Sequence, residues 1–117
     1  MMPYKQLLIP EYHEFIDALG VAPEPAEGET AQRLSLQADG EAMAVTFDVI
    51  GRSVYCVWSR GERVLSEIFH EGATMLRIEN SGQGTQLIVD LETDASKGRL
   101  LLIVVPEFAI HSRILLR

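Results

Sequence analysis

The sequence predicts an α+β domain: an antiparallel sheet of five or six strands with an N-terminal helix and a second helix packed on it. Three observations support this fold class. A stretch near the N-terminus has apolar residues at helical spacing, several later stretches alternate apolar and polar residues as half-buried strands do, and residues 62–80 return to helical spacing. A chain of 117 residues suits a single domain, 1–117.

The N-terminal helix is expected over Pro10 to Leu19. Its apolar residues fall at positions i, i+3, i+4 and i+7, which are Tyr12, Phe15, Ile16 and Leu19. Pro10 lies where such a helix begins, and Gly20 lies where it ends. The next segment, 22–32, has two prolines, a glycine and three glutamates and no apolar face. It therefore predicts a mobile loop.

Residues 33–60 are expected to form three antiparallel strands. Leu34 and Leu36 lie in the first strand, and 42–49 and 54–58 form the second and third. An Asp39-Gly40 pair between the first two strands is a tight-turn signal. These strands supply one apolar face of the sheet.

Residues 62–80 leave two interpretations open. Apolar residues follow helical spacing from Val64 to Leu76, which favours a helix that ends or kinks near Gly72. The rival interpretation is two strands, 63–69 and 73–79, that turn at Glu71-Gly72, because glycine costs a helix roughly 1 kcal/mol relative to alanine.

A β-hairpin is expected over 86–105. Leu87, Val89 and Leu91 alternate with polar residues in the first arm, and the predicted register pairs Leu91 with Leu100. The second arm is apolar on both faces, which is typical of a central strand. After Pro106, the segment 108–116 fits either a short final strand or a helical turn.

The second apolar face of this hairpin is the candidate partner-binding surface, formed by Ile88, Leu101, Ile103 and Val105. Exposed, contiguous apolar patches usually mark interaction sites. A helix of the same chain could instead cover this face, and the residues would then be scaffold.

The sequence offers no convincing catalytic, cofactor or metal site, and none is predicted. Three groups of polar residues lack metal-ligand spacing and are expected to be solvated: His13 with Asp17, the His70-Glu71 pair, and the acids Asp90, Glu92 and Asp94. Cys56 lies in an alternating strand, where a buried small hydrophobe is expected rather than a nucleophile. Gly82-Gln83-Gly84 precedes a strand rather than a helix and predicts a plain turn.

Net charge and composition restrict the partners. A net charge of −7 argues against nucleic acid and is compatible with a basic protein partner. The single cysteine fits a reducing compartment, residues 1–6 lack the apolar core of a signal peptide, and the apolar run 100–105 is too short to span a bilayer. We therefore expect a cytoplasmic protein that does not bind membranes.

Two stretches resemble class I type III secretion chaperones, the family of the Tir chaperone. Phe15-Ile-Asp-Ala-Leu-Gly20 is similar to the end of that family's first helix, and Met75-Leu-Arg-Ile-Glu-Asn80 with the following hairpin is similar to its second helix and closing strands. The resemblance implies a small acidic homodimer that holds an extended client segment without using ATP.

Two functional hypotheses follow from the sequence. The first is a non-catalytic protein-binding module, chaperone-like or an adaptor or inhibitor, whose partner is another protein or a second copy of the chain. The second is a small-molecule-binding protein or enzyme with a pocket between helix and sheet, lined by Tyr12, Tyr55, Trp58 and His70.

Overall fold

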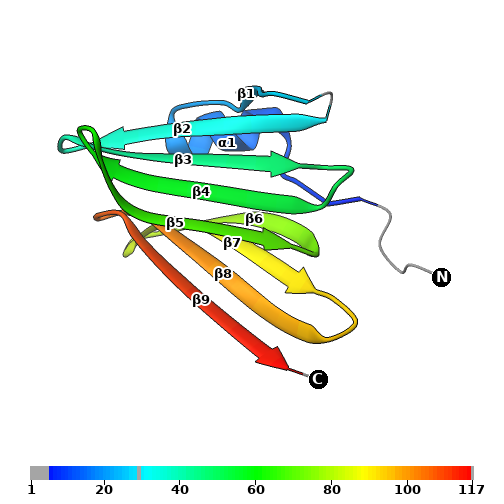
Figure 1. Ribbon diagram of the computed structural model, residues 1–117. Helices are drawn as coiled ribbons and strands as arrows, with labels where there is room; N and C mark the ends of the chain where they lie inside the picture. The colour runs from blue at the N-terminus through cyan, green and yellow to red at the C-terminus, as the bar shows by residue number, and fades with distance from the viewer. Residues whose placement is uncertain (1–5, 29, 117) are drawn as a thin grey trace.

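The protein is built from two antiparallel sheets and one short helix, as a computed structural model shows (Figure 1). The structure describes residues 6–28 and 30–116. Residues 1–5 and 117 of the predicted domain, and residue 29 of the predicted loop, lie outside the described residues. The five-stranded sheet has the order β1-β2-β3-β4-β5 and the four-stranded sheet the order β6-β7-β8-β9. The elements are α1 (Tyr12–Leu19), β1 (Glu24–Pro25), β2 (Ala31–Ala38), β3 (Glu41–Asp48), β4 (Ser53–Arg60), β5 (Arg63–Glu71), β6 (Ala73–Ser81), β7 (Gly84–Glu92), β8 (Ser96–Val105) and β9 (Ala109–Leu116).

The predicted α+β class with one sheet and two helices is wrong, because most of the described chain is strand. Residues 63–81 form β5 and β6 instead of a second helix. The helical spacing arose because β5 carries apolar side chains on both faces: Ile68 packs against the core, whereas Val64 and Phe69 are each 55% exposed. Gly72 separates the two strands with a φ of 80°, and a Cβ there would lie 2.7 Å from the Glu92 carbonyl oxygen. The chain therefore turns at Gly72 from one sheet to the other.

The five-stranded sheet confirms the three strands expected over 33–60. Leu34 pairs with Val45, and Val45 pairs with Cys56, so that all three side chains lie buried on one face. Asp39 and Gly40 both have positive φ angles, 52° and 80°, as a two-residue hairpin turn of the right twist requires.

The four-stranded sheet contains the expected hairpin, but its register differs. Val89 pairs with Leu100 and Leu91 with Gly98, two residues away from the predicted partners. A shift of two residues keeps every side chain on its face, so alternation alone could not determine the register. The turn determines it: the Thr93 hydroxyl accepts hydrogen bonds from the backbone N–H groups of Ala95 and Ser96 and starts β8 at Ser96.

Residues 109–116 form β9, an outer strand of this sheet among the described residues. This agrees with the strand alternative for the end of the chain. The side chains of β9 are mostly exposed, and Leu115 and Leu116 are 66% and 85% exposed.

The core lies between the inner faces of the two sheets and is closed on one side by α1, which lies behind β2 and β3 in Figure 1. Phe15 is the buried residue of α1, and its ring stacks on that of Phe47 with centroids 6.2 Å apart. The segment before α1 joins both sheets, because the Leu7 N–H donates to the Val49 carbonyl and the Leu8 N–H donates to the Thr74 carbonyl. No helix among the described residues is long and apolar enough to cross a membrane.

Candidate functional site

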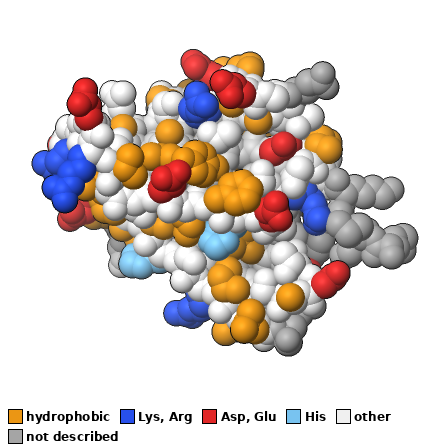
Figure 2. All heavy atoms as spheres, viewed as in Figure 1, with side chains coloured by type: hydrophobic (Ala, Val, Ile, Leu, Met, Phe, Trp, Pro, Cys, Tyr) orange, Lys and Arg blue, Asp and Glu red, His pale blue; other side chains and the backbone are white. Residues whose placement is uncertain are grey.

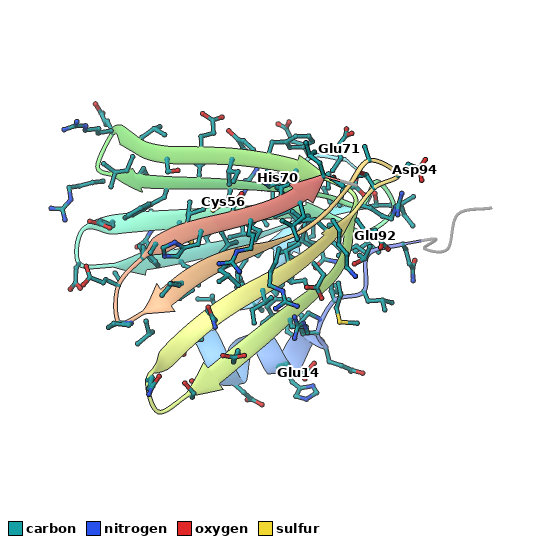
Figure 3. All side chains as sticks on the ribbon, turned by 90° about the horizontal axis from the view of Figure 1, so that it is seen from below. Glu14, Cys56, His70, Glu71, Glu92 and Asp94 are labelled. Carbon is teal, nitrogen blue, oxygen red and sulfur yellow. The ribbon has the colours of Figure 1, made fainter. Side chains whose placement is uncertain are left out.

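The four predicted partner-binding residues all lie on the part of the four-stranded sheet that faces away from the core. Ile88 pairs with Leu101 across β7 and β8, and Ile103 lies two residues further along β8. None of these residues belongs to the core cluster, although Ile88 is only 5% exposed. We call this surface the outer face of β6–β9. Figure 3 shows α1 beside β6, at the opposite side of the sheet from β9.

This outer face is hollowed. One groove of about 590 Å³ crosses all four strands and is lined by Glu79, Gln86, Ile88, Arg99, Leu101, His111, Ser112 and Arg113. A second hollow of about 250 Å³ shares Glu79 and Gln86 with the groove, and its lining includes Ile103 and Val105. The four predicted residues therefore contribute to two adjoining hollows rather than to a flat surface.

Charged side chains surround the apolar floor of the groove. The Asp90 carboxylate accepts hydrogen bonds from Arg99 Nε at 3.0 Å and from Arg77 Nη2 at 3.4 Å. The Gln86 side-chain amide donates to the Glu79 carboxylate at 3.0 Å. Within residues 6–28 and 30–116, no ion pair or side-chain hydrogen bond involves Arg113 or His111. The groove thus has a free cation above an apolar floor.

Sequence reasoning missed the basic residues of the groove. Arg99 shares a strand face with Leu101 because it lies two residues before it, a signal that alternation already contained. His111 and Arg113 are cross-strand partners of Leu101 and Arg99, respectively. The place of these two residues on the groove follows from the pairing of β9 with β8, which the sequence left open.

Burial and spacing argue against chemistry at the other candidate groups that the structure describes. Burial raises the pKa of the Cys56 thiol to about 12, so it stays protonated and is a poor nucleophile. No group of three His, Cys, Asp or Glu side chains among the described residues could hold a metal ion. The segment 82–83 is a turn between β6 and β7.

The four residues suggested for a pocket between helix and sheet are not brought together. Tyr12 is 65% exposed on α1, and Tyr55 and Trp58 project from opposite faces of β4. The Tyr55 hydroxyl donates to the Glu67 carboxylate, which raises the pKa of the tyrosine, whereas Trp58 Nε1 donates to Glu41 at 2.8 Å. A hollow of about 340 Å³ does separate the start of α1 from β6, and its lining includes none of these four residues.

A second apolar patch lies on part of the outer side of the five-stranded sheet, beside the Tyr55–Glu67 pair. Figure 2 shows hydrophobic side chains gathered over this sheet. By strand pairing and burial, this side of the sheet carries Phe69, which is 55% exposed and pairs with Tyr55, and Val57, which is half-buried. The sequence did not predict this surface, because the favoured interpretation of residues 62–80 was a helix and two strands were only the rival.

Comparison with solved structures finds a shared fold. A chain of the contact-dependent growth inhibition toxin–immunity protein complex from Klebsiella pneumoniae 342 matches with a TM-score of 0.81 and 14% sequence identity, over 92% of this chain and 96% of that chain. No protein-family model and no curated protein matches the sequence.

The resemblance to type III secretion chaperones is therefore wrong. The neighbour in structure belongs to a toxin–immunity protein complex, and the stretch Met75 to Asn80, which was likened to the second chaperone helix, lies in β6. The end of α1, Phe15 to Gly20, carried too little information, because an apolar turn closed by glycine ends many helices.

Proposed function

We propose that this chain is an immunity-type protein, which binds a protein toxin and holds it inactive. The observation that carries the proposal is the match in fold to a chain of a toxin–immunity protein complex along almost the full length of both chains. The chain then acts by binding alone, as the non-catalytic module expected from the sequence does.

The proposed toxin-binding surface is the outer face of β6–β9. Its floor supplies apolar area mainly through Leu101, because Ile88 is only 5% exposed, and Arg99 and Arg113 at the margin supply polar contacts. Interfaces commonly combine an apolar centre with a polar rim in this way. Because the side chains stand on paired strands, binding requires little ordering of the backbone, which favours affinity.

Net charge supports a basic toxin. The chain carries a net charge of −7, and residues 11–29 contain six acids and no lysine or arginine. Such a field speeds association with a positively charged protein and weakens with added salt. The toxin-association rate is therefore expected to fall as ionic strength rises.

A second copy of this chain is the competing occupant of the outer face, as in the homodimer expected from the sequence. Light scattering of the purified chain at high concentration separates the two. A monomer leaves the outer face free for a toxin. A dimer that Leu101→Asp dissociates would assign the face to self-association.

The function is tested by growth rescue. The tagged chain is purified from its source organism, and any protein bound to it is identified and then expressed in bacteria alone or with the chain. The proposal expects a protein that arrests growth alone and is harmless with the chain. Three outcomes would contradict the proposal: the bound protein is harmless alone, the chain leaves its toxicity unchanged, or no partner is recovered.

A further inference from the structure

We propose that the groove on the outer face of β6–β9 receives an extended segment of its partner in which an apolar residue and an aspartate or glutamate are two residues apart. This inference rests on the proposed function for the identity of the partner, a protein toxin. It adds the chemistry that the groove recognises.

The charge of the groove differs from the charge of the whole chain. Its lining holds two cations, Arg99 and Arg113, against one carboxylate, Glu79, which already accepts a hydrogen bond from Gln86. Asp90 beside the groove is shared between Arg77 and Arg99. A chain of net charge −7 thus presents a local excess of cations here.

Arg113 is the group most available to a ligand. It forms no ion pair or side-chain hydrogen bond within the described residues, whereas Arg99 is partly neutralised by Asp90. Arginine binds carboxylates through two parallel hydrogen bonds, which fixes direction as well as charge. An acidic side chain is therefore the natural partner of Arg113.

The register of the sheet sets the spacing between the two contacts. Ile88, Leu101 and His111 form one cross-strand row. Asp90, Arg99 and Arg113 form the neighbouring row on the same face. Rows on one face are about 6.6–6.8 Å apart, because each residue of a strand advances about 3.3–3.4 Å.

The same rise separates residues i and i+2 of an extended ligand, and their side chains point to the same side. For a ligand that runs parallel to β8, an apolar side chain over Leu101 therefore places the side chain two residues away over the neighbouring row, at Arg99 and beside its cross-strand partner Arg113. The overall acidity attracts a basic toxin from a distance, and this local pattern selects how the toxin docks.

The test uses random twelve-residue peptides displayed on phage and selected on the immobilised full-length chain. We expect enrichment of an apolar residue followed or preceded, at a spacing of two, by aspartate or glutamate. Arg113→Glu should weaken binding of a selected peptide at least tenfold in fluorescence polarisation. Arg63→Glu, the same charge reversal on an exposed residue of the other sheet, should change it less than twofold.

Selection of no peptides, selection of basic peptides, or equal binding by wild type and Arg113→Glu would overturn the inference. These outcomes are separate from the growth-rescue test. If the chain neutralises a toxin but selects no peptides, the proposed function stands and the inference about the groove is refuted. If the chain selects the expected peptides but neutralises no toxin, the inference about the groove stands and the proposed function is refuted.

Discussion

Gly98→Ala tests whether the close contact between β8 and β9 shapes the groove. Gly98 pairs with Ile114, and a Cβ at position 98 would lie 2.4 Å from the Arg113 carbonyl oxygen and 2.6 Å from Ile114 Cδ1. Ordinary contacts begin at 3.4 Å, so β9 must move away by about 1 Å at this point. The residue displaced is the one that carries the free cation of the groove.

Gly98→Ala should lower the free energy of unfolding by about 1–3 kcal/mol, because it overpacks the contact between β8 and β9 and weakens the hydrogen bonds between these strands. Urea denaturation measures this loss, and hydrogen exchange locates it. We expect faster amide exchange in residues 109–116 and little change in β2–β4. Binding of a selected acidic peptide should also weaken, because Arg113 moves relative to Leu101.

Gly82→Ala is the matched control, because a Cβ at position 82 meets nothing within 4 Å and the residue has no positive φ. Its stability should stay within about 1 kcal/mol of wild type, on the stabilising side if it changes. If Gly98→Ala has the stability of wild type and unchanged exchange in β9, the reasoning about this contact is refuted.

Three further predictions concern the core, the outer face and the turn before β4. Phe15→Ala should lower the free energy of unfolding by about 3–5 kcal/mol in urea denaturation, because the ring on Phe47 anchors α1; a loss below 1 kcal/mol would show that α1 contributes little. Leu101→Asp with Ile103→Asp should keep the circular dichroism of wild type but abolish partner capture, and light scattering should show the wild-type molar mass; retained capture would exclude this surface. Hydrogen bonds from Thr30, Gly51 and Ile50 to the Asp48 carboxylate lower its pKa below the ordinary value of 3.8. The ionised carboxylate therefore stabilises the folded protein at neutral pH. This stabilisation is lost as pH falls from 3.8 through the lower pKa of the folded state. Asp48→Asn should therefore be less stable than wild type at pH 7, with a gap that narrows in thermal denaturation as pH falls below 3.8; a gap independent of pH would contradict the assignment.

Alternation predicted the strands that bury one face. Met43, Val45 and Phe47 are fully buried between polar or small neighbours, so the period of two was visible in the sequence. It failed for β5, whose apolar residues face both the core and solvent. Such a strand has no single buried face, and spacings of three and four residues then imitate a helix.

Half of the candidate site could be predicted in the same way. Leu101 and Ile103 were placed together because they are two residues apart on a strand, and the structure puts them on one face. His111 and Arg113 could not be placed, because β9 is mostly exposed and follows Pro106 without an alternating pattern. The hollow itself depends on how four strands twist, which no local pattern encodes.

The most direct test of the central claim is the affinity of the recovered toxin for Leu101→Asp and for Val57→Asp, measured by titration calorimetry. Both substitutions place a carboxylate on a half-buried apolar position of an outer sheet face, one on each sheet. If the outer face of β6–β9 binds the toxin, Leu101→Asp weakens binding by about thirtyfold or more, as expected for a central interface residue, and Val57→Asp leaves it unchanged. Unchanged affinity for Leu101→Asp, with loss for Val57→Asp, would place the toxin on the five-stranded sheet instead.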